Sequence, residues 1–240
     1  MENEKVQNFR LLYKKGDFMT KLEEILNILN PIIKDKKGLI FDVDGTLLDS
    51  MPMWARLDIE YLESMGITPE PNFHNEVKMM TMLDASKYIK QKFGVDKDAE
   101  IIAKEIEDIA YKYYEDVLLI KKNSKELLLE LKNRGYKMYV ATANEYDMCG
   151  AALKRNKVME LFDGLVTCSM TGYSKERPDV YLLACEKMGL SVEDTVIFED
   201  SCFAINTALK AGFTVVGVYD KAEEENWDRI CDITHGQIVF

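Results

Sequence analysis

The sequence has few of the residues that form disulfide frameworks or thiolate and histidine metal sites. It contains five cysteines, no two of them in a Cys-x-x-Cys spacing, and two histidines with no partner at ligand spacing. An odd number of cysteines spread through apolar segments is typical of buried free thiols. We therefore expect no disulfide framework and a reducing, cytoplasmic location.

Positive charge is also scarce. The 240 residues include 31 Lys and Arg against 42 Asp and Glu, which gives a net charge of -11. Because attraction to phosphates dominates binding to nucleic acids and anionic membranes, we expect neither as a partner. No apolar run approaches membrane-spanning length, and the first residues lack a basic region followed by an apolar stretch. We therefore expect no export signal and no membrane anchor, and a phosphorylated substrate would need a local cation.

Internal repeats and low-complexity linkers are missing too, and what remains is an alternation of short apolar segments with helical ones. Strands are predicted from their apolar, β-branched composition. Alternating strands and helices are typical of βαβ units, so the fold class is α/β, a doubly wound (Rossmann-like) parallel sheet. The predicted strands cover residues 39–41, 136–142, 165–167, 195–198 and 214–218, with 237–240 as a candidate edge strand.

One long stretch departs from this alternation. Residues 54–118 have helical periodicity and contain no segment that resembles a core strand. We therefore predict an all-helical cap at 54–118, inserted into an α/β core made of 37–53 and 119–240. The core alone has a comfortable size for one doubly wound domain.

Residues 1–36 precede the first strand and form an N-terminal helical extension. Apolar residues at positions 18, 22, 25, 29 and 32 predict a helix over about 17–33, with Asp17 as its N-cap. Such a stripe belongs either to a helix that packs on its own domain or to a dimer contact. We favour the first, because such stripes are usually core faces. We expect a monomer or a weak homodimer.

Two acids follow the first predicted strand directly. The apolar residues 39–41 lead into Asp42 and Asp44, which Val43 separates, before Gly45 and Thr46. Alternate side chains of a strand share one side, and ligands bind at the carboxyl ends of parallel strands. A single acid there would be read as a cap of the next turn, but two acids followed by Gly-Thr favour a functional site.

Other polar residues follow the remaining strands. Thr142 ends the second predicted strand, the pair Glu199-Asp200 ends a later one, and Lys175 lies in a loop before a helix. If the strands are neighbours, four acids meet, and two carboxylates about 4 Å apart repel by about 4 kcal/mol at an effective dielectric of about 20. A hard divalent cation with oxygen ligands, Mg²⁺, resolves this conflict. By contrast, Lys121-Lys122 is read as a solvent-exposed pair.

The order of these motifs, with a helical insertion after the first, resembles the haloacid dehalogenase superfamily. The likeness covers residues 38–218 and is closest to the branch of β-phosphoglucomutase and many small-molecule phosphatases. It implies phosphoryl transfer in two steps, on a small phosphorylated metabolite, with Asp42 as nucleophile and Asp44 as general acid and base. It also implies that Asp42, Thr46, Thr142 and Lys175 contact the phosphoryl group. Mg²⁺ would be bound by Asp42, the Asp44 backbone carbonyl and Asp200, with Glu199 either a direct ligand or a residue that supports the ligands. The acid at position 44 disfavours a dehalogenase.

Two departures from the family pattern bear on function. The lysine loop keeps Lys175 and Pro178-Asp179 but lacks the usual Gly before the lysine and Pro after it. The cap stretch 78–82, Lys-Met-Met-Thr-Met, lacks the Arg and Gly with which the mutases bind a second phosphate. We therefore favour a phosphatase over a sugar-phosphate mutase. A noncatalytic binding protein on the same fold is the remaining alternative.

Overall fold

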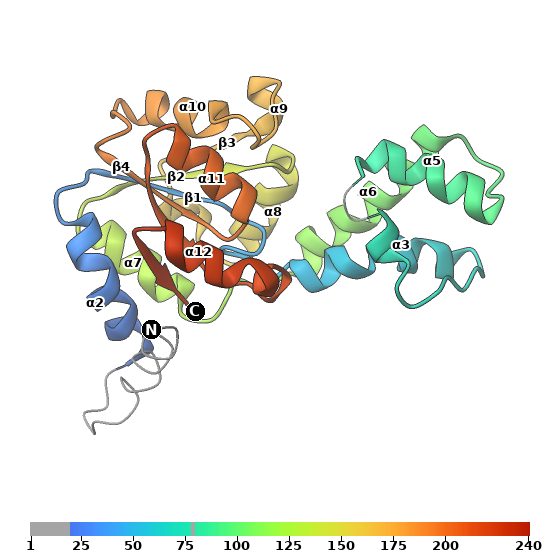
Figure 1. Cartoon of the computed structure of the whole chain (residues 1–240), viewed down its shortest axis with the longest axis horizontal. Coiled ribbons are helices and arrows are strands. Elements are labelled where there is room, and N and C mark those ends of the chain that lie inside the picture. The colour runs from blue at the N-terminus through green and yellow to red at the C-terminus, as the bar shows by residue number, and fades with distance from the viewer. Residues whose placement is uncertain (1–19, 78–79) are drawn as a thin grey trace.

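The computed structural model describes residues 20–77 and 80–240, and its centre is a six-stranded parallel sheet (Figure 1). The strand order is β3-β2-β1-β4-β5-β6, which places the first strand in the interior of the sheet. The predicted strands are confirmed, including the edge strand near the C-terminus. The strands are β1 Gly38–Phe41, β2 Lys137–Thr142, β3 Gly164–Thr167, β4 Thr195–Glu199, β5 Thr214–Val218 and β6 Gly236–Ile238.

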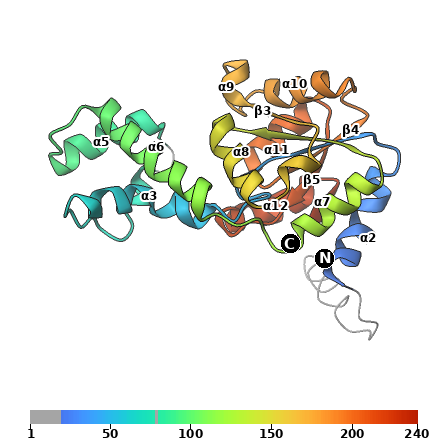
Figure 2. The same cartoon turned by 180° about the vertical axis from the view of Figure 1, so that it is seen from behind.

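Helices cover both faces of this sheet (Figures 1 and 2). One apolar cluster includes residues of α2, α7 and α8, and the other includes residues of α10, α11 and α12 on the opposite face. This is the predicted doubly wound arrangement. The core helices are α2 Lys21–Ile33, α7 Ser124–Asn133, α8 Tyr146–Arg155, α9 Cys168–Thr171, α10 Asp179–Met188, α11 Cys202–Lys210 and α12 Trp227–Ile233, with short 3₁₀ helices η1 Met159–Leu161 and η2 Lys221–Asn226.

Between β1 and β2 the chain forms a separate group of helices, the cap, which extends to one side of the sheet (Figure 2). Helix α6 packs on both α3 and α5. Pro52 lies in the first turn of α3, where its missing N–H costs no hydrogen bond. The cap helices are α3 Met51–Ser64, α4 His74–Val77, α5 Met82–Phe93 and α6 Ala99–Asp116.

The pairing register of β1, β2 and β4 explains why the polar residues that follow these strands meet at one edge of the sheet. Phe41 pairs with Val140 of β2 on one side and with Phe198 of β4 on the other. The residues that follow these three therefore come out at nearly the same level of the sheet. Because all strands are parallel, this level is the carboxyl edge, where α/β proteins bind ligands.

Helix α2 packs on its own chain. Its N-cap is Thr20, which forms a capping box with Glu23, whereas the predicted cap Asp17 lies outside the described residues. Ile25, Leu29 and Ile33 are buried in the same apolar cluster as β1, and α2 contacts β6 and α7. The favoured interpretation, a helix on its own domain, agrees with this packing. Within residues 20–77 and 80–240, no helix is both long and apolar enough to cross a membrane.

The packing of α2 predicts a large stability effect. Leu29 is fully buried, so Leu29→Ala should lower the free energy of unfolding by about 2–5 kcal/mol through lost burial and a residual cavity. The neighbouring Ile28 is exposed, and Ile28→Ala should cost less than about 1 kcal/mol. Urea unfolding of both variants measures the difference. Equal, small effects would contradict the packing described here.

Candidate active site

The carboxyl ends of β1, β2 and β4 bring five of the predicted residues into one buried group. Asp42 follows β1, Thr142 ends β2, and Glu199 and Asp200 close β4. Lys175 reaches the group from the loop before α10. All five side chains are buried, which is unusual for charged residues and requires that they be paired.

Three of the acids form a compact oxygen cluster. Carboxylate oxygens of Asp42, Glu199 and Asp200 lie within 4.8 Å of one another. Burial, together with repulsion from Glu199, raises the pKa of Asp42 to about 8, although Lys175 opposes the shift. Burial and the charges of Glu199 and Asp42 also raise the pKa of Asp200 well above its ordinary value. Close, buried carboxylate oxygens with excess negative charge are the donor set that suits Mg²⁺, so these residues fit the metal implied by the motifs.

Lys175 supplies the one buried positive charge that the described residues bring to this cluster. Its Nζ donates to Asp42 and, over 2.8 Å, to Glu199 Oε2. Burial alone would lower the pKa of Lys175, but the carboxylates of Asp42 and Glu199 raise it well above the ordinary value, so the ammonium stays charged. The atypical loop thus still delivers its lysine to the site. Tyr181 of α10, which the sequence analysis missed, also donates to Glu199 Oε2 over 3.0 Å.

Gly45 and Thr46 shape the turn around Asp200. Gly45 has a φ of +76°, and a Cβ at this position would lie 2.2 Å from Asp200 Oδ2. A side chain would therefore be strained and would displace the carboxylate. The buried Thr46 hydroxyl donates to Asp200 Oδ1 over 2.8 Å. The structure thus places Thr46 beside the acid cluster, where its hydroxyl orients Asp200.

Thr142 lies at the start of the turn that leaves β2. Its buried hydroxyl oxygen accepts a hydrogen bond from the Asn144 backbone N–H over 3.1 Å and lies 3.5 Å from the Cys149 sulfur. This bond holds the hydroxyl at the carboxyl edge of the sheet, next to β1. Thr142 therefore lies at the same edge of the sheet as Asp42.

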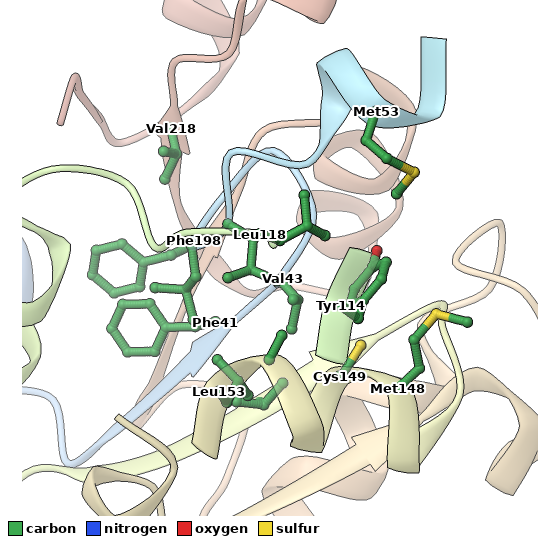
Figure 3. Close-up of a cluster of buried hydrophobic side chains, with 14 of the residues drawn as sticks. Phe41, Val43, Met53, Tyr114, Leu118, Met148, Cys149, Leu153, Phe198 and Val218 are labelled. Carbon is green, nitrogen blue, oxygen red and sulfur yellow. The ribbon is translucent and has the colours of Figure 1, made fainter. Parts of the chain in front are cut away.

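Asp44 lies beside the cluster and has its own set of donors. Its Oδ1 accepts from the Ser50 hydroxyl over 2.6 Å and from the Tyr114 hydroxyl, and its Oδ2 accepts from Asn144 Nδ2 over 2.6 Å. Tyr114 reaches from the cap helix α6 into the apolar cluster that holds Val43 and Cys149 (Figure 3). Burial, followed by the charge of Asp44, raises the pKa of Tyr114 well above its ordinary value, so the phenol keeps its proton.

Lys121 also belongs to the surroundings of the site, and its prediction as solvent-exposed was wrong. Its side chain is 12% exposed and forms a 2.8 Å ion pair with Asp220. It also donates to the carbonyl oxygens of Tyr219, over 2.9 Å, and of Gly45. It therefore ties the turn after β1 to the segment after β5, because buried backbone oxygens there need a donor. Lys122 is exposed, as predicted.

A cavity of about 960 Å³ lies between the core and the cap, and its lining includes Asp42, Asp44, Lys175, Glu199 and Asp200. The cap side contributes Met51, Trp54 and Met80, which are mainly apolar. The first turns of α11 contribute Phe203 and Asn206, next to Asp200. A cavity of this size accommodates a small-molecule ligand.

Comparison with known proteins agrees with this geometry. The model of the haloacid dehalogenase-like hydrolase family matches residues 39–218. Among curated relatives, the phosphorylated carbohydrates phosphatase of Thermotoga maritima is 23% identical over 73% of this chain and 82% of its own. The fructose-1-phosphate phosphatase of Escherichia coli K12 is 29% identical over 75% of this chain and 95% of its own.

Solved structures share the fold. The crystal structure of a haloacid dehalogenase family IA hydrolase from Entamoeba histolytica has a TM-score of 0.69 and 24% identity, over 85% of this chain and 92% of that one. The chain therefore belongs to the haloacid dehalogenase-like hydrolase family, and within it the chain is a phosphoric monoester hydrolase.

The raised carboxyl pKa values predict how stability depends on pH and metal. Between the unfolded Asp pKa of 3.8 and the folded value of about 8, folded Asp42 binds a proton that the unfolded chain does not. In EDTA, the free energy of unfolding should therefore fall as the pH rises from about 5 to about 8. Urea unfolding at several pH values checks this, and a flat or rising profile would contradict it.

Asp200→Asn provides the matched metal test. In EDTA at about pH 8 this variant should be more stable than the wild type, because it removes one buried negative charge. With Mg²⁺ at about 100 times its Kd, the wild type should gain about 2.7 kcal/mol and the variant much less. The exposed Asp228→Asn serves as the control and should behave like the wild type. An equal Mg²⁺ effect in all three proteins would place the metal elsewhere.

Proposed function

We propose that this protein is a Mg²⁺-dependent phosphatase that hydrolyses a small phosphorylated carbohydrate through an aspartyl-phosphate on Asp42. The observation that carries the proposal is the contact of Lys175 with both Asp42 and Glu199 inside a buried cluster of acids. A buried nucleophilic carboxyl group needs nearby positive charge to ionise; Lys175 supplies part of this charge, and a bound Mg²⁺ would supply the rest. The two curated relatives named above support a phosphorylated carbohydrate as substrate.

In the first step, an Asp42 carboxylate oxygen attacks the phosphorus in line with the leaving oxygen. The new bond joins Asp42 to phosphorus while the bond from phosphorus to the sugar oxygen breaks. Asp44, which lines the same cavity, donates a proton to the departing oxygen. Lys175 and the Thr142 hydroxyl stabilise the phosphoryl oxygens.

In the second step, Asp44 accepts a proton from a water molecule as the water oxygen attacks phosphorus. The bond to Asp42 breaks, inorganic phosphate leaves, and both carboxyl groups return to their starting states. The Thr46 hydroxyl acts indirectly by holding Asp200 in place. When bound by Asp42, Glu199, Asp200 and the Asp44 backbone carbonyl, Mg²⁺ supplies positive charge against the phosphoryl oxygens.

We propose residues 54–118 as the cap that covers the substrate and 37–53 with 119–240 as the catalytic core, with 1–36 as an extension. Met51, just before the cap, and Trp54 and Met80 of the cap line one wall of the cavity, and none of these described residues is a cation that could bind a second phosphate; Lys210 and Arg229 line the cavity from the core. Thr81 is used as the N-cap of α5, where it accepts from the Asp84 backbone N–H over 3.1 Å. Positions 78 and 79 of the cap stretch 78–82 lie outside the described residues. This wall supports a phosphatase over a mutase.

Phosphate release tests the proposal. A panel of phosphorylated sugars and sugar alcohols should give phosphate with Mg²⁺ and none with EDTA. Asp42→Asn should lower kcat by at least about 10⁴-fold, because the amide cannot form the phosphoenzyme. A colorimetric phosphate assay on matched preparations provides the measurement.

Asp108→Asn is the matched control for this experiment. Asp108 pairs with Lys104 on the exposed face of α6, outside the acid cluster, and the variant should keep the wild-type rate. Isomerisation of a sugar phosphate without phosphate release would favour the mutase instead. No phosphate release and no isomerisation of any substrate would favour a noncatalytic binding protein.

A further inference from the structure

Asp44 is held by groups from both sides of the boundary between cap and core. Tyr114 belongs to the last turn of α6 in the cap, whereas Asn144 follows β2 in the core. Both donate to the Asp44 carboxylate, and Asn144 Nδ2 also donates to the Tyr114 hydroxyl over 2.8 Å. The indole Nε1 of Trp54 donates to the same hydroxyl over 3.1 Å. These contacts form a closed network around one carboxylate.

The donors in this network fix the direction of every hydrogen. An amide must turn its nitrogen toward a carboxylate, because its oxygen would be repelled, so Asn144 is a donor here. The Tyr114 oxygen accepts from Asn144 and from Trp54, and neither N–H group can act as an acceptor. The single Tyr114 proton is therefore left for Asp44. The hydroxyl hydrogen of Tyr114 therefore points in one direction, toward Asp44, and does not rotate among several acceptors.

The number of hydrogen bonds that each Asp44 oxygen accepts shows which oxygen can carry a proton. Oδ1 accepts one hydrogen bond from Ser50 and one from Tyr114, and these two bonds occupy both lone-pair positions of Oδ1. Oδ2 accepts from Asn144 and keeps one position free. Asp44 can therefore take up and deliver a proton at Oδ2 without breaking the network.

We propose that Tyr114, together with Asn144, is a positioning residue that orients Asp44 so that Oδ2 transfers the proton to and from the reacting oxygen. This inference rests on the proposed function, because it assumes that Asp44 is the general acid and base. Tyr114 itself touches neither the phosphorus nor the leaving group. Its effect is limited to steps in which Asp44 moves a proton, and this separates it from a residue that only stabilises the fold.

Two substrates whose leaving groups differ in their need for a proton test this positioning role. Departure of an alkoxide needs a proton from Asp44, whereas 4-nitrophenolate is stable enough to leave without one. The value of kcat/KM reports the first phosphoryl transfer, before water attacks. With Mg²⁺ present, Tyr114→Phe should lower kcat/KM for glycerol 2-phosphate by at least about 10-fold. For 4-nitrophenyl phosphate it should stay within about 2-fold of the wild type.

Tyr113→Phe is the matched control, because Tyr113 is the adjacent residue of α6 and bonds Glu60, away from the site. It should leave both substrates unchanged. Asn144→Ala should, like Tyr114→Phe, lower kcat/KM for glycerol 2-phosphate and not for 4-nitrophenyl phosphate. In the double variant, the loss of kcat/KM should be smaller than the product of the two single losses, because both residues act on one carboxylate. If Tyr114→Phe shows no cooperative urea unfolding, Asn144→Ala carries the test.

Three results would overturn the inference. An equal loss of kcat/KM on both substrates would mean that Tyr114 supports only the fold. Unchanged kcat/KM on both would mean that Asp44 is oriented without it. In these two cases the wild type still releases phosphate, so the proposed function stands. If the wild type releases phosphate from neither substrate, both the function and the positioning role fail.

Discussion

The structure depends on an electrostatic conflict that the fold creates at the carboxyl edge of its sheet. Asp42, Glu199 and Asp200 are buried together, and a single lysine, Lys175, contacts two of them. Like charges at this distance in a partly dry site are strongly unfavourable. The arrangement persists because the apolar strands β1 and β4 lie side by side. Phe41 and Phe198, each of which directly precedes an acid in the sequence, stack on one another (Figure 3). The energy of the packed core thus holds in place a cluster whose oxygens could bind a metal ion.

A second constraint is the way in which the chain crosses from core to cap and back. Met51 and Trp54 lie in the first turn of α3, and Tyr114 lies in the last turn of α6, so both crossings come close to Asp44. Just beyond the return crossing, Lys121 bonds the Gly45 carbonyl and pairs with Asp220. The turn that carries Asp44 is therefore held from the core by one charged residue and from the cap by one phenol. This dual support suits a group that must transfer a proton with defined geometry.

Local patterns were enough to predict the sheet, the helical insertion and the acids. Strand β1 and the acids after it are neighbours in the sequence, so an apolar run followed by Asp-Val-Asp-Gly-Thr contains the information directly. Tyr114 and Asn144 could not be found in this way, because they lie 70 and 100 residues from Asp44 along the chain. Lys121 was misread for the same reason: a Lys-Lys pair usually faces solvent, and its buried partners lie about as far away in the sequence. Asn144 comes two residues after Thr142, which ends β2, so only its closeness in sequence to a predicted site residue pointed to it.

The most direct test of the account asks whether Asp42 carries the phosphoryl group. Asp44→Asn should slow attack by water more than transfer from a substrate with a good leaving group, so the phosphoenzyme should accumulate. The variant is incubated with 4-nitrophenyl phosphate and Mg²⁺, quenched in acid, and its peptides are examined by mass spectrometry. The account predicts one phosphoryl group on the peptide that contains Asp42, and none when Asp42→Asn is added to the variant. A phosphoryl group on another residue, or on no residue while phosphate is still released, would contradict it.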